Sequence, residues 1–268
     1  MSRPFQIVAH RGIAGAAPEN TLPAFQQALD SGADAVHLDV RLTRDGVPAI
    51  YHYVYLEAAT TGAGPIFTHS FEQIRAFEIR GTGPAAAVPC RMPTLADVLE
   101  LFAGQIALEI EIKGPEPESA TAVSALLGRF RRFWDTVEVT SYEPALLLAV
   151  GRACPGLACD LLFPRSESWM ESDTAAYLAL QRARLAGARA VHLHPAQLAP
   201  DVVAAIRAGG VDVHAWDVND EAALTVAAEL GIPRVCTDRF EQAYAFRAQY
   251  AARRAGLAAR LQDGSWTT

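Results

Sequence analysis

Short apolar segments alternate with longer amphipathic segments along almost the whole chain. The long segments are rich in Ala and Leu, with polar residues at helical spacing. This alternation is typical of repeated strand–helix units that build a parallel sheet. Eight segments have the strand pattern: Gln6–His10, Ala35–Leu42, Ile106–Lys113, Val137–Ser141, Ala158–Phe163, Ala190–His194, Asp212–Val218 and Arg234–Thr237.

A helical pattern follows each predicted strand. The eight helices are predicted at Thr21–Ser31, Thr94–Ala103, Glu118–Phe133, Pro144–Ala153, Ala175–Ala186, Pro200–Ala208, Glu221–Leu230 and Gln242–Leu261. Eight units in about 240 residues, with no Pro/Ser-rich linker, favour an α/β fold of the (β/α)8 TIM barrel type. We therefore predict one domain over residues 1–268. A large doubly wound open sheet is the alternative.

One long segment, Val47–Met92, interrupts the regular pattern after the second strand. It far exceeds the usual strand-to-helix loop of about 2–6 residues. Loops at this position open on the catalytic face of a barrel, so we predict that the insertion caps the site. The alternative is a loop without a functional role.

Composition and charge exclude several classes of protein. The chain has 268 residues, 51% of them hydrophobic, which excludes disorder and a disulfide-stapled miniprotein. Its net charge of −7 makes nucleic acid an improbable partner. The four scattered cysteines fit free thiols in a reducing compartment, and no segment has the length of a membrane span. We therefore expect a cytoplasmic protein, whereas the sequence leaves its oligomeric state open.

Ionisable residues share one face of two predicted strands. Asp39 lies on the same face as His37, and Glu111 lies on the same face as Lys113. A barrel interior accommodates such charges only when they are paired or bind a ligand. Asp39 and Glu111 are therefore candidate ligands of a divalent metal, and a buried salt-bridge network is the alternative.

Two histidines are candidates for proton transfer. His10 ends the first strand and His52 follows a short extended run that begins the insertion. Two imidazoles at one site can divide the duties of general acid and general base near neutral pH. Arg11 and Lys113 are suited to neutralise a phosphate group.

These residues lie within motifs that resemble those of a known family. Residues 8–52 read VAHRGIAGAAPENTLPAFQQALDSGADAVHLDVRLTRDGVPAIYH, and the similarity continues through TTGAGPIF, MPTLADVLEL, LEIEIKG, HAWDVND and VCTDR. The ordered set resembles the glycerophosphodiester phosphodiesterase family over nearly the whole chain. Each motif is weak alone, but the order of all of them is specific.

The resemblance implies a barrel enzyme that hydrolyses glycerophosphodiesters to sn-glycerol 3-phosphate and an alcohol. It implies that His10 and His52 act as acid and base, and that the substrate's glycerol hydroxyl attacks phosphorus before water completes the hydrolysis. Arg11 and Lys113 would contact phosphate, Trp216 would help to wall the pocket, and a divalent ion, Mg²⁺ or Ca²⁺, would assist. The implied partner is a small-molecule glycerophosphodiester.

The sequence departs from the family pattern at several positions. His37 stands where the family has a glutamate, so the metal ligands would be His37, Asp39 and Glu111. An imidazole in place of a carboxylate makes Mn²⁺ or Zn²⁺ more acceptable. Tyr53 and Ala58 replace an acidic and a basic residue of the pattern. The alternatives are thus a non-hydrolytic protein that binds a phosphate ligand, or a phosphodiesterase with a shifted substrate.

Three further histidines carry less weight. His192 and His194 share one face of the sixth predicted strand and resemble a metal pair, and His214 precedes Trp216 by two residues. We interpret all three as packed or pocket-lining histidines rather than ligands.

Overall fold

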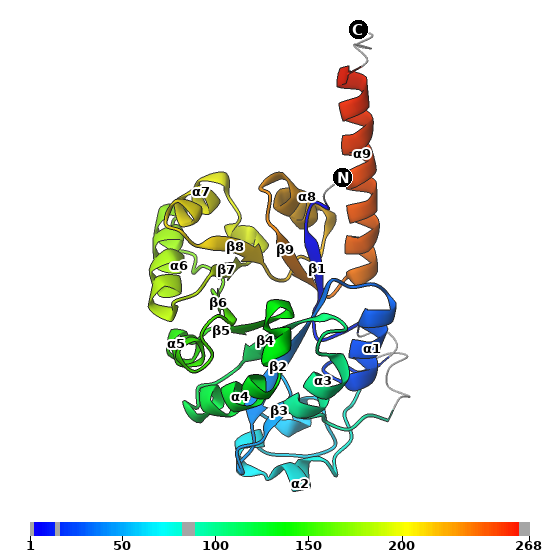
Figure 1. Ribbon diagram of the computed structural model, residues 1–268, viewed down its shortest axis with the longest axis vertical. Coiled ribbons are helices and arrows are strands. Elements are labelled where there is room, and N and C mark those ends of the chain that lie inside the picture. The colour runs from blue at the N-terminus through cyan, green and yellow to red at the C-terminus, as the bar shows by residue number, and fades with distance from the viewer. Residues whose placement is uncertain (1–2, 14–16, 82–88, 263–268) are drawn as a thin grey trace.

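A closed barrel of eight parallel strands forms the centre of the computed structural model, which describes residues 3–13, 17–81 and 89–262 (Figure 1). The parallel strands are β1 (Gln6–Ala9), β2 (Ala35–Leu42), β4 (Ala107–Ile112), β5 (Val137–Ser141), β6 (Ala158–Leu162), β7 (Ala190–Leu193), β8 (Asp212–Ala215) and β9 (Arg234–Thr237). β1 pairs with β9 on one side and with β2 on the other. This double pairing closes the sheet, so the TIM-barrel prediction is confirmed and the open-sheet alternative is wrong.

Helices cover the outside of the barrel and follow the strands in sequence. They are α1 (Leu22–Asp30), α3 (Leu95–Phe102), α4 (Glu118–Arg129), α5 (Pro144–Ala153), α6 (Ser172–Ala186), α7 (Pro200–Ala208), α8 (Glu221–Glu229) and α9 (Phe240–Gln262). The predicted helix 118–133 is divided, because a 3₁₀ helix, η4 (Arg131–Thr136), follows α4. The last turns of α9 extend away from the barrel (Figure 1).

The main hydrophobic core lies between the strands and these helices. Five neighbouring strands, from β1 to β6, each contribute a buried residue to it: Ile7, Leu38, Ile110, Val139 and Leu161. Because strand residues alternate between faces, their neighbours point into the barrel. Those inward neighbours are largely polar, and they form the sites described below.

The segment between β2 and α3 has a small core of its own. It contains β3 (Pro48–Ile50), which pairs antiparallel with β2, then η1 (Leu56–Ala58), η2 (Ile66–Thr68) and α2 (Phe71–Ile74). Leu56, Ile66 and Ile74 pack together in this core. Residues 82–88 of the predicted insertion lie outside the described residues. The folded segment holds His52, which follows β3, beside the barrel opening.

The cysteine prediction agrees with the structure, in which all four cysteines are buried and free. A search of the described residues finds no helix that combines the length and apolar character needed to span a bilayer.

Candidate active site

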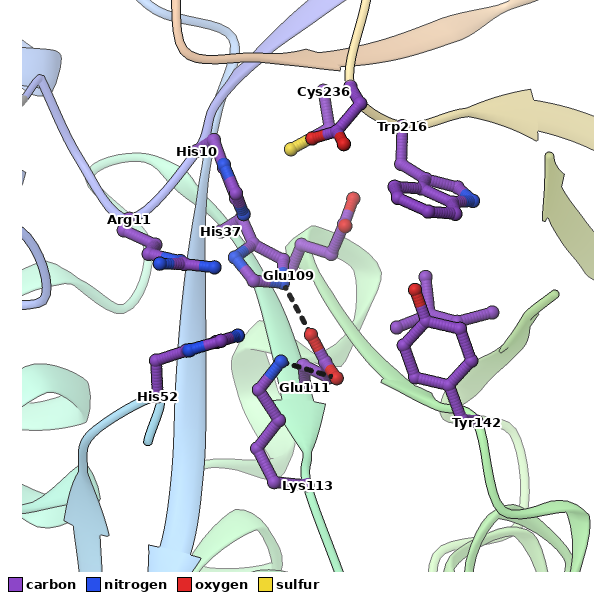
Figure 2. Close-up of a pocket in the computed structure, with 12 residues that line it drawn as sticks. His10, Arg11, His37, His52, Glu109, Glu111, Lys113, Tyr142, Trp216 and Cys236 are labelled. Carbon is purple, nitrogen blue, oxygen red and sulfur yellow. Dashed lines mark ion pairs between the residues drawn. The ribbon is translucent and has the colours of Figure 1, made fainter. Parts of the chain in front are cut away.

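A pocket of about 180 Å³ opens at the carboxyl ends of the strands (Figure 2). Among its lining residues are seven of the eight site residues predicted from the sequence: His10, Arg11, His37, His52, Glu111, Lys113 and Trp216. The eighth, Asp39, is fully buried behind the pocket wall. The structure therefore brings together side chains that lie as far apart in the sequence as His10 and Trp216.

Asp39 is the point at which the charged groups meet. Lys113 Nζ lies 2.9 Å from Asp39 Oδ1 and 2.8 Å from Glu111 Oε1. Arg11 Nε lies 3.1 Å from Asp39 Oδ2, which also accepts a hydrogen bond of 2.8 Å from Asn20 Nδ2. Each buried carboxylate thus has a cation beside it, as burial of a charge requires.

These neighbours determine the protonation of the buried groups. Burial alone would raise the pKa of Asp39, but Lys113 and Arg11 hold it well below its usual range. Burial lowers the pKa of His37, so its imidazole is neutral at pH 7. Burial would likewise lower the pKa of Arg11, but the carboxylates of Asp39 and Glu19 raise it.

The residues His37, Asp39 and Glu111 fit a divalent cation. Each offers one ligand atom, and these atoms lie within 4.8 Å of one another. His37 Nε2 is 3.3 Å from Glu111 Oε2, whereas its buried Nδ1 has no hydrogen-bond partner among the described residues. An imidazole beside two carboxylates is a suitable donor set for such an ion.

The two candidate proton-transfer histidines have different surroundings. His10 Nδ1 lies 2.6 Å from Asp238 Oδ1, and its ring is 5.0 Å from that of His37. Burial lowers the pKa of His52 to about 4. Figure 2 shows both rings directed into the same pocket. The arrangement can therefore offer one imidazole paired with a carboxylate and one that is neutral.

Three supporting residues were not assigned a role from the sequence: Asp238 at His10, Asn20 at Asp39, and Glu19 at Arg11. Glu19 Oε1 lies 3.0 Å from Arg11 Nη1. Glu19 and Asn20 stand in the Pro-Glu-Asn-Thr motif, which was the signal for these two residues. Asp238 directly follows β9, and this position after a strand was the signal for Asp238. Only closure of the barrel places Asp238 beside His10.

The departures from the family pattern occupy different places. The Tyr53 ring packs edge-on against His52, with 4.7 Å between ring centroids. Burial, and then the charge of Glu19, raise the pKa of Tyr53. Ala58 is exposed in η1, outside the lining of the pocket. Of the two, Tyr53 is therefore the one that can affect the second imidazole.

The glycerophosphoryl diester phosphodiesterase family matches residues 10–242. The chain belongs to this family. A glycerophosphodiester phosphodiesterase of Caldanaerobacter subterraneus is 28% identical over 244 residues, which cover 87% of this chain and 93% of that protein.

Solved structures of glycerophosphodiester phosphodiesterases have the same fold. The enzyme of Agrobacterium tumefaciens has a TM-score of 0.73 and 26% identity, covering 91% of this chain and 99% of its own. An Oleispira antarctica phosphodiesterase, solved with the product sn-glycerol-3-phosphate, has a TM-score of 0.76 and 25% identity, covering 90% of this chain and 96% of its own. The family resemblance seen in the sequence is thus confirmed, and the chain is a glycerophosphodiester phosphodiesterase of the phosphoric diester hydrolase class.

Proposed function

We propose that this pocket hydrolyses glycerophosphodiesters to sn-glycerol 3-phosphate and an alcohol, with His10 and His52 as the acid/base pair. The observation that carries the proposal is the convergence of both imidazoles on one pocket that also holds Arg11 and Lys113. The product bound in the Oleispira phosphodiesterase supports glycerol phosphate as the product here.

The surroundings of the two histidines divide their roles. His52 has a lowered pKa of about 4, so it is neutral and can accept the proton of the substrate's glycerol hydroxyl. His10 Nδ1 lies 2.6 Å from Asp238 Oδ1, and this carboxylate can orient the ring. The glycerol oxygen then bonds to phosphorus to form a cyclic phosphate, and the bond from phosphorus to the alcohol oxygen breaks as His10 protonates that oxygen. The two histidines exchange roles when water opens the cyclic phosphate.

The charged groups of the pocket bind and orient the phosphate. Arg11 and Lys113 offer N–H donors to its oxygens, and the Trp216 ring forms one wall (Figure 2). A divalent cation held by His37, Asp39 and Glu111 would polarise the phosphoryl oxygens. The mixed imidazole and carboxylate donors favour Mn²⁺ or Zn²⁺ over Ca²⁺.

A coupled assay tests the reaction. The metal-stripped protein is supplied with Mg²⁺, Ca²⁺, Mn²⁺ or Zn²⁺, and the release of sn-glycerol 3-phosphate from glycerophosphocholine and glycerophosphoethanolamine is measured. His10→Ala and His52→Ala should each lower kcat by about 10²–10⁴-fold. His69→Ala is the matched control, because His69 lies in the same inserted segment but outside the pocket lining. Unchanged turnover in both pocket variants would refute the assigned roles.

A second variant tests the ion preference. His37→Glu supplies the carboxylate found in the family pattern, and we expect activation by Mg²⁺ or Ca²⁺ to rise relative to Mn²⁺ or Zn²⁺. His37→Gln removes the imidazole without adding charge and serves as the control. The same ion order in all three proteins would argue against His37 as a ligand.

The substrate range is a separate question. Turnover of other phosphodiesters, but not of glycerophosphocholine or glycerophosphoethanolamine, would identify a shifted substrate.

A further inference from the structure

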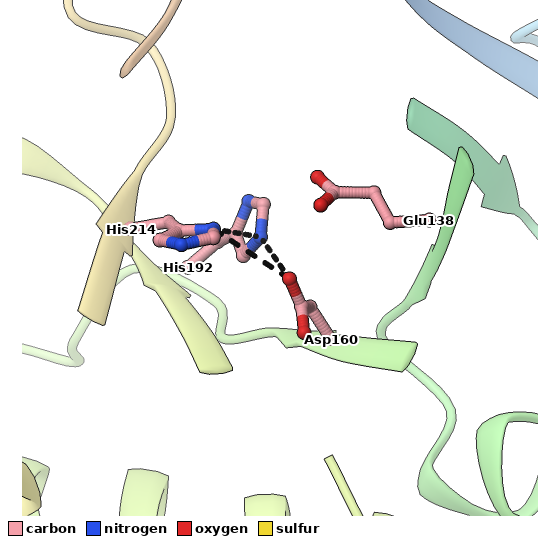
Figure 3. A group of neighbouring side chains, drawn as sticks. All are labelled: Glu138, Asp160, His192 and His214. Carbon is pink, nitrogen blue, oxygen red and sulfur yellow. Dashed lines mark hydrogen bonds and ion pairs between the residues drawn. The ribbon is translucent and has the colours of Figure 1, made fainter. Parts of the chain in front are cut away.

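A second cluster of metal-ligating side chains lies inside the barrel, separate from the ligands of the pocket (Figure 3). Glu138 comes from β5, Asp160 from β6, His192 from β7 and His214 from β8. All four residues are at least 94% buried. The proposed function gives none of them a role.

Three ligand atoms of the cluster form a nearly regular triangle. His192 Nε2 is 3.1 Å from His214 Nδ1 and 3.5 Å from Asp160 Oδ2, and His214 Nδ1 is 3.5 Å from the same Asp160 oxygen. Donors at about 2.0–2.2 Å from a tetrahedral Zn²⁺ lie about 3.3–3.6 Å from each other. The triangle therefore has the dimensions of one face of a zinc coordination tetrahedron.

Hydrogen bonding alone explains this arrangement poorly. One proton can join the two histidine nitrogens, but both contacts with Asp160 are at the 3.5 Å limit of a hydrogen bond. In addition, His192 Nδ1 is buried without a hydrogen-bond partner among the described residues. The Glu109 carboxylate is near it, with Oε1 at 3.8 Å, which is beyond hydrogen-bond distance.

The fourth member and its neighbours complete the surroundings. The Glu138 carboxylate is directed toward His192 in Figure 3, and its ligand atom is within 4.8 Å of the others. Arg189 Nη2 lies 2.8 Å from Glu138 Oε2 and 2.7 Å from Asp160 Oδ2, and Arg234 Nη1 lies 2.5 Å from Glu138 Oε1. Burial, and then the charge of Glu138, raise the pKa of Glu109 well above its usual value, so the two guanidinium groups face the charges of Glu138 and Asp160.

The cluster also has its own entrance. A cavity of about 430 Å³ at the amino-terminal end of the strands is lined by Gln6, Arg189, Asp212, His214, Pro233 and Arg234. His214 is thus reached from the end of the barrel opposite to the proposed active site. An ion could enter there without passing through the catalytic pocket.

We propose that Glu138, Asp160, His192 and His214 form a second metal site, which binds one four-coordinate Zn²⁺ ion in the barrel interior. His192 Nε2, His214 Nδ1 and Asp160 Oδ2 are three of its ligands, and Glu138 or a water molecule supplies the fourth. With Glu138 as the fourth ligand the ion joins four successive strands, so its role is to stabilise the barrel. From the sequence we interpreted His192, His194 and His214 as packed or pocket-lining histidines, and the proposal replaces this interpretation for His192 and His214. His194 packs against Trp216, with 5.3 Å between ring centroids.

Metal binding is tested in a protein that lacks the two carboxylate ligands of the pocket. In the full-length Asp39→Asn/Glu111→Gln variant, stripped with chelator and titrated with Co²⁺, we expect one bound equivalent with the intense visible bands of four-coordinate cobalt. The Zn²⁺-loaded variant should show two imidazole ligands by X-ray absorption. No bound equivalent, or an ion without imidazole ligands, would overturn the proposal and leave a hydrogen-bonded charge network.

Two further substitutions in the same background locate the ion. His214→Ala should abolish the bound equivalent, whereas His194→Ala should retain it, because His194 directly follows β7 and lies outside the cluster. Circular dichroism confirms that each variant is folded. A bound equivalent that persists in folded His214→Ala would contradict the assignment. Removal of Zn²⁺ should also lower the Tm of the background variant but not that of His214→Ala.

Discussion

At the scale of single residues, Asp39 joins the fold of this protein to its chemistry. Its side chain is fully buried and contacts Arg11, Lys113 and Asn20. A buried charge of this kind is stable only while its partners stay in place. Asp39 therefore fixes the two cations that the phosphate would meet. The alternation of faces along each strand identified Asp39 and Glu111 as candidate metal ligands, because this alternation depends only on neighbours in the sequence.

The pair of His10 and Asp238 could not be predicted in that way, since 228 positions separate the two residues. Asp238→Asn should lower kcat by about 10–100-fold with little change in KM, because the imidazole loses the carboxylate that orients it. Steady-state kinetics with glycerophosphocholine measures both constants.

Asp220→Asn is the control for this substitution. Asp220 caps the amino terminus of α8 through Ala223 N, and asparagine caps a helix about equally well. Its kcat should match that of the unaltered enzyme. A kcat of Asp238→Asn that equals the control value would show that the carboxylate does not position His10.

The burial of His52 sets the pH response of its imidazole in the metal-free protein. Its imidazole should titrate near pH 4, well below the usual value of about 6.5, because burial disfavours the charged ring. The ring proton resonance followed by NMR, and assigned by its loss in His52→Gln, measures this pKa. A midpoint near 6.5 would contradict the assignment of His52 as a neutral base.

The sign of the linked stability change follows from that lowered pKa. Above about pH 6.5 the ring is neutral in both the folded and the unfolded chain, so its protonation does not reduce the free energy of unfolding there. As the pH falls from there to about 4, the unfolded chain binds the proton first, and the free energy of unfolding decreases. His52→Gln should reduce this part of the pH dependence, as urea titrations at several pH values would show.

At the scale of elements, the turn between β1 and α1 places two site residues at once. Arg11 and Asn20 both adopt positive φ, of 57° and 56°, and the Asn20 amide N–H donates to the Arg11 carbonyl at 3.0 Å. The sequence predicted the strand and the helix on either side, because their patterns are regular. It could not predict this turn, whose shape depends on contacts between the two elements.

At Gly12 the turn approaches α1 closely. Its φ is +85°, and a Cβ atom there would lie 2.7 Å from the Ala24 carbonyl carbon. Gly12→Ala should lower the free energy of unfolding by about 2–5 kcal/mol, through backbone strain and overlap together. Activity should fall as well, because His10 and Arg11 directly precede this position. Urea unfolding followed by tryptophan fluorescence measures the change in stability.

Gly32→Ala separates the two causes. Gly32 has a similar φ of +76°, but nothing lies within 4 Å of the Cβ position. This variant should lose only about 1–2 kcal/mol, the cost of a left-handed conformation alone. Equal losses in the two variants would mean that the close approach of Gly12 to Ala24 has no energetic effect.

At the scale of the whole molecule, the barrel depends on contacts between the first and last segments of the chain. β1 pairs with β9 over four residues, and α9 packs on β1 through the stacked rings of Phe5 and Phe246. The repeated pattern predicted eight strand–helix units, but repetition alone does not state that the first strand meets the last. Closure is a property of the assembled sheet, and the β1–β2 and β1–β9 pairings supply it.

One ion pair secures this closure at the end of the barrel away from the proposed active site. Arg247 of α9 pairs with Asp34, whose Oδ2 also accepts a hydrogen bond of 2.8 Å from the Ile7 amide of β1. Arg247→Ala should lower the free energy of unfolding by about 1–3 kcal/mol, because it leaves the mostly buried Asp34 carboxylate with less compensation. Arg3 also pairs with Asp34, but its side chain is 67% exposed, so Arg3→Ala should cost at most about 1 kcal/mol. Urea titration of both variants gives the comparison, and kcat should remain unchanged in each. An equal effect of the two arginines would show that α9 contributes to closure through its apolar contacts rather than through this buried pair.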